Sequence, residues 1–141
     1  MIASEKAVQQ YGLTPLARIT GLSSVGVAPR IMGIGPEPAT RRLLDRAGLQ
    51  VTDIDLFALN EAFASQSLAV LRGLGLPVDS DVVNPNGGAI AFGHPLGMSG
   101  ARLALSAAID LADRADHGAE RALATMCIGI GMGISQLLES V

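Results

Sequence analysis

The sequence has little charge, few aromatic residues and a single cysteine, and each shortage excludes a class of protein. Charged residues make up 16% of the 141 residues, aromatic residues 3%, and tryptophan is absent. The apolar share of 49% excludes a disordered acidic or basic tail, because such tails are poor in apolar residues. The net charge of −3 gives no field for nucleic acid, and so few aromatic residues make no base-stacking surface. We therefore predict no nucleic-acid partner.

Cys127 is the only cysteine, so the chain forms no internal disulfide. This composition fits a reducing compartment, and we predict a cytoplasmic location. One cysteine and two histidines cannot build a common structural zinc site, so no metal is expected. Charge at Glu5 and Lys6 falls where a secretory signal is apolar, so we expect no signal peptide. Residues 122–138 are uncharged, but glycines and polar residues interrupt them, which favours a buried strand over a membrane span.

The chain alternates helix-like and strand-like patterns, which predicts an α/β fold with a mixed sheet. Helices are expected at 4–11, 39–47, 62–74 and 97–115, and strands at 16–27, 55–59, 81–83, 121–127 and 133–138. Loops are expected at 28–38 and 84–97. In the second helix, Leu43, Leu44 and Ala47 are predicted to face inward, and Gly48 to end the helix.

The helices at 62–74 and 97–115 carry too little charge for ordinary surface helices. The first has no charged residue before Arg72, and the polar residues of the second fall on one narrow stripe. A surface helix normally shows polar residues over about half its girth. We therefore predict that 97–115 is a buried central helix. Part of its cover would come from a second subunit or from another part of a longer protein.

Asn60 opens the first segment that could carry chemistry, Asn60-Glu61-Ala62-Phe63-Ala64. One interpretation is structural: Asn60 is a natural helix N-cap, and Glu61 suits the helix dipole. The other is functional, because Asn60 follows a strand, and α/β proteins bind ligands at the carboxyl ends of strands. An amide there can hold a water molecule or a substrate oxygen.

His94 lies in the second segment, Asn84–Gly100, which has five glycines and two prolines in 17 residues. Gly93 and Pro95 flank the histidine, so the backbone would fix the direction of its ring, as a general base requires. The structural alternative is a loop histidine with satisfied hydrogen bonds. Neither a phosphate-binding loop nor the dinucleotide fingerprint matches the glycine spacing.

Cys127 begins the third segment, Cys127-Ile128-Gly129-Ile130-Gly131-Met132-Gly133. Glycines after a reactive residue let a ligand approach backbone N–H groups, as an oxyanion hole requires. The alternative is that Cys127 is a small buried apolar residue. Together the three segments favour a site of thiol, imidazole and amide that serves acyl transfer. His117 lies in a polar turn and is expected to be an exposed loop residue.

At these three segments the chain resembles the thiolase family, the acyltransferases that make or cleave 3-ketoacyl-CoA. The resemblance covers essentially all 141 residues in order. It also includes Met32-Gly33-Ile34-Gly35-Pro36 and Ala3-Ser4-Glu5-Lys6-Ala7. Asn84-Pro85-Asn86, Pro95-Leu96-Gly97-Met98 and Thr125-Met126-Cys127 look most like thiolases of the 3-oxoadipyl-CoA kind.

The resemblance implies a role for each site residue. His94 would activate the acyl-accepting cysteine and help to bind the thioester oxygen. Asn60 would hold a water that completes an oxyanion hole with His94. Cys127 would be the second cysteine, which acts as acid and base on the acetyl group. The N–H of Gly129 would belong to the other oxyanion hole. The acyl and pantetheine channel would be lined by Met32, Ala62 and Phe63.

The chain also departs from the family pattern. Thiolases form the acyl-enzyme on a different cysteine, in the first half of the family's chain, whereas this sequence has only Cys127. The family's loop domain, which supplies most coenzyme A contacts, has no counterpart here. The resemblance therefore implies that residues 1–14 end the N-terminal half and that 15–141 form the C-terminal domain.

The same departure sets the expected partners and activity. The chain would need the missing N-terminal half or a split partner chain, and the complete enzyme would be a homodimer or tetramer. No permanently bound cofactor is expected, since the coenzyme A thioester is the substrate. The chain alone should have no thiolase turnover. A non-catalytic interaction module and a hydrolase with Cys127 as nucleophile are the alternatives.

Overall fold

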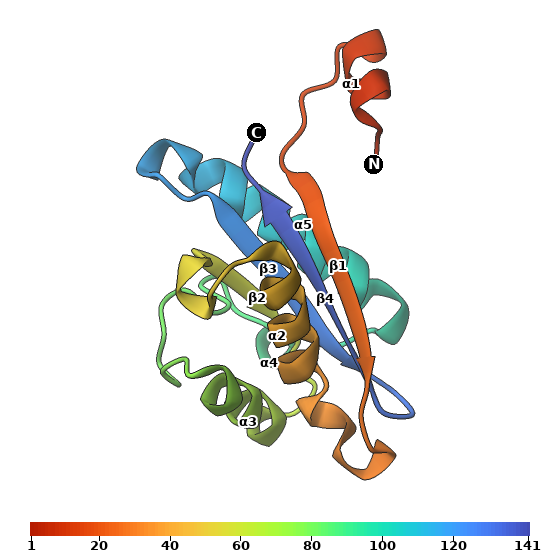
Figure 1. The fold of residues 1–141 in the computed structure, drawn as a ribbon, viewed down its shortest axis with the longest axis vertical. Helices are drawn as coiled ribbons and strands as arrows, with labels where there is room; N and C mark the ends of the chain where they lie inside the picture. Colours follow the sequence, from red (N-terminus) through yellow and green to blue (C-terminus); the bar gives the residue numbers. More distant parts are fainter.

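The computed structural model covers residues 1–141 and shows a sheet with helices on both faces (Figure 1). The strands are β1 (Arg18–Gly26), β2 (Leu56–Leu59), β3 (Arg121–Ile128) and β4 (Met132–Glu139). They form one four-stranded sheet in the order β1-β4-β3-β2. β4 is antiparallel to both its neighbours, whereas β2 and β3 are parallel. The predicted mixed sheet of an α/β fold is therefore confirmed.

Helices form the outer layers. They are α1 (Glu5–Tyr11), α2 (Pro36–Ala47), α3 (Ala64–Leu74), α4 (Ala89–Phe92) and α5 (Leu96–Arg114), with the 3-10 turns η1 (Pro29–Ile34), η2 (Val51–Asp53) and η3 (Ala115–His117). α2 and α3 lie on one face of the sheet and α5 on the other, while α1 stands apart from both layers (Figure 1). None of these helices has the length and apolar character that a membrane crossing requires.

β2 is buried on both faces and joins the two halves of the core. Leu56 and Ala58 pack on the α5 side, whereas Phe57 packs on the α2 side and Leu59 against α3. This alternation is the ordinary period of a strand, and a strand covered on both faces reads as a continuous apolar run. β2 therefore fixes where its carboxyl end, and the residues after it, lie relative to α5.

The predicted helices and strands lie close to their expected bounds, with corrections in and after the first loop. Pro29–Ile34 form η1 and α2 begins at Pro36, because proline fits the first turn of a helix. Ala47 is exposed instead of facing inward, since the buried positions of α2 end at Leu44. The predicted strand 81–83 is reduced to a single bridge between Phe57 and Val83, and the predicted loop 84–97 contains α4.

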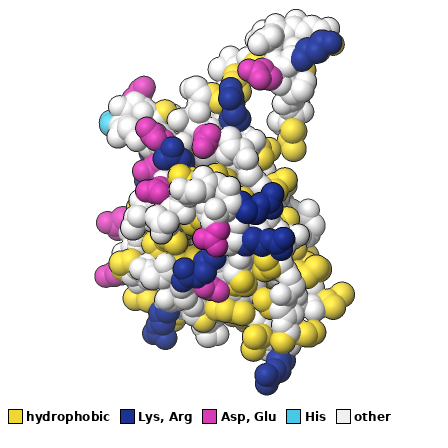
Figure 2. Space-filling view, viewed as in Figure 1, with side chains coloured by type: hydrophobic (Ala, Val, Ile, Leu, Met, Phe, Trp, Pro, Cys, Tyr) yellow, Lys and Arg dark blue, Asp and Glu magenta, His cyan; other side chains and the backbone are white.

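α5 is covered on one side only within this chain. Its buried residues, Ser99, Leu103, Ala107 and Leu111, face the sheet. The large apolar side chains exposed along it are Leu96, Met98, Leu105 and Ile109. Figure 2 shows further hydrophobic side chains gathered over the lower part of the face in view. The chain therefore presents apolar surface on α5 that its own elements do not cover.

Candidate active site

Asn60 lies directly after β2 and is fully buried, with 0% of its surface exposed. Its backbone N–H donates to the carbonyl of Thr125 on β3 at 2.9 Å. α3 begins only at Ala64, and its N-cap position is Phe63, which has extended backbone and no side-chain cap. The structural interpretation of Asn60 as the helix cap is therefore wrong. Because Asn60 lies outside the helix, its amide can bond to another partner.

That partner is His94. The Nδ2 atom of Asn60 lies 3.3 Å from the Nε2 atom of His94, although the two residues are 34 positions apart. The Oδ1 atom of Asn60 is buried and has no hydrogen-bond donor. The structure therefore brings these two predicted site residues into contact and leaves one amide acceptor unused.

His94 is half-buried and stands immediately before α5. Gly93 has φ +89° and ψ 167°, a conformation that side chains rarely adopt. On its other side the ring's Nδ1 atom lies 2.6 Å from the hydroxyl oxygen of Ser99, which is fully buried. The Ser99 hydroxyl also lies 3.1 Å from the carbonyl oxygen of Pro95. Both nitrogens of His94 therefore have partners that fix the ring.

Glu61 ties the end of β2 to the loop that carries His94. One carboxylate oxygen accepts from Asn84 Nδ2 at 2.8 Å, and the other accepts from the Ile90 N–H at 3.0 Å. Asn84 in turn bonds both backbone groups of Leu59 at 2.9 Å. A Cβ at Gly88 would lie 2.3 Å from the Glu61 carboxyl carbon, so a side chain there would displace the carboxylate from these bonds. The interpretation of Glu61 as a helix-dipole partner is therefore wrong, because α3 begins only at Ala64 and the Glu61 carboxylate bonds within this network.

Cys127 lies in β3 near the end of the strand and is only 6% exposed. Thr125 pairs with Leu59 across the parallel strands, so Cys127 and Asn60 both lie at the edge where β2 and β3 end. Burial raises the pKa of the Cys127 thiol, and a backbone hydrogen bond opposes that shift. The hydrogen bonds of the site join His94 and Asn60 to each other but not to the thiol.

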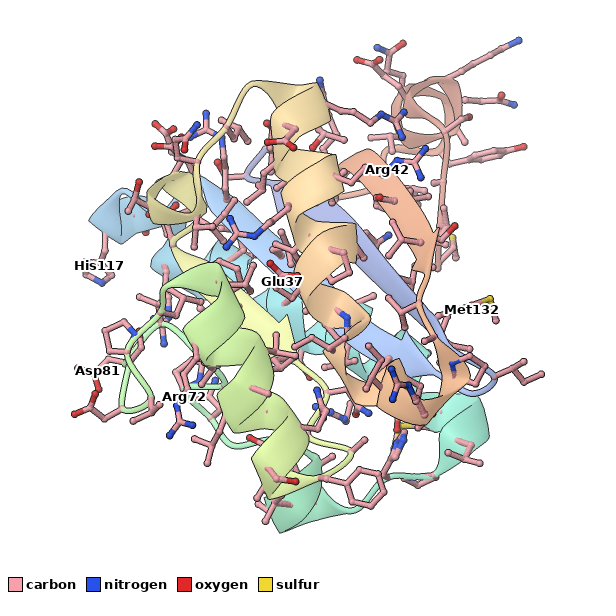
Figure 3. The ribbon with its side chains drawn as sticks, turned by 60° about the horizontal axis from the view of Figure 1, so that its bottom comes forward. Glu37, Arg42, Arg72, Asp81, His117 and Met132 are labelled. Atoms are coloured by element: carbon pink, nitrogen blue, oxygen red, sulfur yellow. The ribbon has the colours of Figure 1, made fainter.

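The remaining predicted site residues lie in turns and short segments next to the ends of the strands and helices. Gly129 is exposed in the turn between β3 and β4. Met32 is half-buried in η1, which contacts α3, β3 and β4. Ala62 is half-buried, whereas Phe63 is 62% exposed just before α3. His117 is exposed, as predicted, and points outward from the turn after α5 (Figure 3).

Met32 and Phe63 lie in two segments, η1 and the residues before α3, and the packing of α2 against both η1 and α3 positions them. Figure 3 shows Glu37 between these two helices. Glu37 pairs with Arg41, which also donates to the carbonyl of Gly73 on α3. A Cβ at Gly73 would lie 2.8 Å from Glu37, so the helices approach closely here. η1 and α3 are therefore fixed relative to each other beside the end of β3.

Comparison with known proteins identifies the family of the chain. The family model "Thiolase, C-terminal domain" matches residues 13–140. The chain belongs to the thiolase family. It is 60% identical over all 141 residues to the 3-oxoadipyl-CoA/3-oxo-5,6-dehydrosuberyl-CoA thiolase of Escherichia coli K12, and covers 34% of that protein. It is 57% identical to the beta-ketoadipyl-CoA thiolase of Pseudomonas putida, with the same coverage.

Solved thiolase structures have the same fold. A Bacillus anthracis acetyl-CoA acetyltransferase is 43% identical, with a TM-score of 0.88 over 98% of this chain. Human mitochondrial 3-ketoacyl-CoA thiolase is 47% identical, with a TM-score of 0.88 over 99% of this chain, and one of its structures holds CoA. In each case the matched region is 34% of the solved chain. The chain thus spans about a third of the length of the thiolases it matches.

Two residues of the site in this thiolase domain, Ser99 and Asn84, were not predicted as site residues from the sequence. Ser99 follows His94 by five positions, and a hydroxyl among the apolar residues that open α5 was the available signal. Asn84 has φ +46°, a left-handed conformation that asparagine tolerates better than most residues. The sequence predicted a loop from residue 84 onward, but not that the Asn84 side chain would bond to Leu59 and Glu61.

Proposed function

We propose that this chain is the C-terminal catalytic half of a thiolase that transfers an acyl group between coenzyme A and acetyl-CoA. The observation that carries the proposal is the contact between Asn60 Nδ2 and His94 Nε2 at the edge of the sheet where Cys127 lies. The chain's 60% identity to a 3-oxoadipyl-CoA thiolase supports it.

In the first step of cleavage, the nucleophile is a cysteine of the N-terminal half. His94 Nε2 takes its proton, and the thiolate attacks the 3-keto carbonyl of the substrate. The oxyanion that develops on the 3-keto carbon is stabilised by the N–H of Gly129, while His94 and a water held by Asn60 bind the thioester oxygen of the substrate. The buried Oδ1 of Asn60, which has no protein donor, supports a place for that water.

Cleavage of the carbon–carbon bond then leaves the enolate of acetyl-CoA, which needs a proton. Cys127 donates it, while protonated His94 and the water held by Asn60 stabilise the enolate oxygen. The Cys127 thiolate next takes the proton of the incoming coenzyme A thiol, whose sulfur attacks the acyl-enzyme. In the direction of synthesis Cys127 takes the proton from the acetyl group. The raised pKa of Cys127 supports this role, because the thiol stays protonated until the enolate forms.

The substrate class follows from the relatives. We infer a 3-oxoacyl-CoA thioester, with 3-oxoadipyl-CoA foremost because several similar proteins are beta-ketoadipyl-CoA thiolases. Met32, Ala62 and Phe63 line its acyl and pantetheine channel, and no further cofactor is bound permanently. Residues 1–14 end the N-terminal half, and 15–141 form the C-terminal domain. The complete enzyme is a cytoplasmic homodimer or tetramer.

A chimera tests this function. The chain replaces the corresponding last third of the Escherichia coli relative, and thiolytic cleavage of 3-oxoadipyl-CoA is measured. We expect activity, and a loss of at least about 100-fold in the His94→Ala and Cys127→Ala chimeras. His117→Ala is the matched control and should keep full activity, because His117 is exposed outside the site. An active chimera that tolerates His94→Ala would contradict the proposal.

A non-catalytic interaction module is the second candidate, favoured by the exposed apolar side chains of α5. Such a module would associate with a partner, while a chimera containing it would have no activity. A hydrolase with Cys127 as nucleophile is disfavoured, because a buried thiol with a raised pKa is not an activated nucleophile. The chimera assay and the mass of the chain in solution separate the two remaining candidates.

A further inference from the structure

The hydrogen bonds of the His94 ring involve a residue that the proposed reaction does not yet use. Ser99 lies in the first turn of α5, is fully buried, and has its hydroxyl 2.6 Å from His94 Nδ1. We propose that Ser99 is a positioning residue that holds the ring proton of His94 on Nδ1 and so keeps Nε2 unprotonated, with the lone pair that a base requires. The inference rests on the proposed role of His94 as the base.

The hydroxyl of Ser99 has one proton to donate and two lone pairs that can accept hydrogen bonds. The Pro95 carbonyl oxygen lies 3.1 Å away, in the geometry of a serine that bonds back to the preceding helical turn. When Ser99 donates to this carbonyl, it has only lone pairs left for His94. The Nδ1 atom must then carry the proton and donate it to Ser99.

The other side of the ring agrees with this assignment. In a neutral imidazole with a proton on Nδ1, the Nε2 atom is an acceptor. The atom that faces it is Nδ2 of Asn60, an amide donor, at 3.3 Å. Asn60 therefore donates to the lone pair of Nε2, and Ser99 accepts from Nδ1–H. This chain of donors runs from Asn60 through the ring and Ser99 to the Pro95 carbonyl.

A proton held on Nδ1 prepares His94 to act as the base in the proposed reaction. When Nε2 takes a proton from the nucleophilic cysteine, the ring becomes a cation with N–H donors on both nitrogens. Ser99 still accepts from Nδ1–H, so no group on that side has to turn. On the other side the Nδ2 donor of Asn60 has to move off Nε2, because two donors cannot bond to each other. If Ser99 donated to Nδ1 instead, the ring proton would lie on Nε2, and His94 could not act as the base.

Nitrogen NMR of the full 141-residue chain tests the proposal without any turnover. The chain is labelled with ¹⁵N-histidine, and the two ring nitrogens are distinguished by their long-range couplings to ring protons. At a pH where the ring is neutral, we expect the His94 proton on Nδ1. In Ser99→Ala the preference should be lost, and the ring should show a mixture of tautomers. Ser99→Thr, which keeps the hydroxyl, should restore the Nδ1–H form.

Ser106→Ala is the matched control, because it makes the same change on the same helix away from His94, and it should leave the tautomer unchanged. A proton on Nε2 of the unsubstituted chain would overturn the proposal, even if Ser99→Ala fails to fold. An unchanged tautomer in folded Ser99→Ala would also overturn it.

Kinetics of the chimera give a second readout. Ser99→Ala should lower kcat about tenfold, with KM for the thioester within about twofold, since the serine does not touch substrate. An unchanged kcat in an otherwise active chimera contradicts the role of Ser99. An inactive chimera that keeps the Nδ1–H tautomer contradicts the proposed function but not the positioning of His94.

Discussion

At the scale of single residues, the direction of the His94 ring depends on the backbone of Gly93. This glycine has φ +89°, and an added Cβ would find no atom within 4 Å. Space therefore does not limit the residue at this position, whereas backbone conformation does. The cost of a side chain here is strain that either unfolds the loop or turns His94 away from Asn60.

Gly93→Ala should therefore destabilise the chain by about 1–3 kcal/mol, the cost of forcing a side chain into such a conformation. Urea unfolding followed by circular dichroism measures the change. Gly97→Ala is the matched control, because Gly97 also has open space around a Cβ but lies inside α5 without positive φ. That variant should be neutral or more stable by up to about 1 kcal/mol. Equal effects of the two substitutions would contradict the account.

Cys127 provides a second prediction at this scale, because its burial raises the pKa of its thiol. In the native chain the Cys127 thiol therefore keeps its proton at a pH where the thiol of the unfolded chain has lost it. The free energy of unfolding should fall as pH rises from the unfolded to the folded thiol pKa, and should be unaffected by this group below that window. Urea unfolding between neutral and alkaline pH measures the slope, with Cys127→Ser as the variant that lacks it.

Alkylation gives an independent check on the same thiol. Since Cys127 is the only cysteine, the rate of iodoacetamide reaction reports this residue alone. We expect slow reaction at neutral pH and a midpoint above the ordinary value for a thiol. Rapid alkylation of the folded chain at neutral pH would show an exposed or activated thiolate, and would contradict the acid and base role proposed for Cys127.

At the scale of elements, the turn between β3 and β4 contains an unusual side chain next to Gly129. Ile130 has φ +73° and is 87% exposed. A β-branched residue in the left-handed region is strained, and this one gains little from burial. Such strain is common where a backbone has to hold a ligand. The turn therefore holds the N–H groups after Cys127 in a conformation that its sequence does not prefer.

Replacement of this isoleucine should release the strain. We expect Ile130→Asn to stabilise the chain by about 1 kcal/mol, because asparagine tolerates the left-handed region. Thermal unfolding measures the gain. Ile90→Asn changes another exposed isoleucine, in α4 and without positive φ, and should give no gain. A loss of stability in Ile130→Asn would show that the side chain makes contacts that outweigh the backbone strain.

Most elements could be predicted from the sequence because their periodicity is local. The bounds of α5, β3 and β4 follow from apolar spacing and from the glycines around them. The start of α2 was missed, because Pro36 and Pro38 suit a first helical turn as well as a loop. For Asn60 the N-cap and the functional interpretation both stayed open, because local sequence cannot show that a side chain has a distant partner.

The site itself was predictable only in part, for the same reason. Motifs named Asn60, His94 and Cys127, and the structure places the first two in contact. The bonds of Glu61 to Asn84 and Ile90 depend on how the loop folds back over the end of β2. Ser99 was missed because its importance comes from burial against His94, which no single stretch of sequence records.

At the scale of the whole molecule, the exposed apolar face of α5 is the feature that connects fold to function. Leu105 is 55% exposed and Ile109 41% exposed on a helix whose opposite side is fully buried. The low share of charged residues, 16%, agrees with a surface that is partly covered in the working protein. In the proposed enzyme the N-terminal half covers this face of α5.

Charge on this face should block that association. Leu105→Lys with Ile109→Lys should leave the circular dichroism of the chain unchanged, because both side chains are exposed. Mixed with the N-terminal half of the Escherichia coli relative, the variant should fail to form the complex seen by size-exclusion chromatography with light scattering. Val78→Lys is the control, because Val78 is 54% exposed but lies in a loop outside α5. This variant should associate normally with the N-terminal half. Normal association of the double variant would place the interface elsewhere.

The most direct test of the central claim is the rate of 3-oxoadipyl-CoA thiolysis by this chain, alone and after addition of the N-terminal half. The account predicts no turnover by the chain alone, because its only cysteine is the one assigned to acid and base catalysis. It predicts activity after mixing, and none when the chain carries His94→Ala. Turnover by the isolated chain, or a mixture that is active with His94→Ala, would contradict the claim.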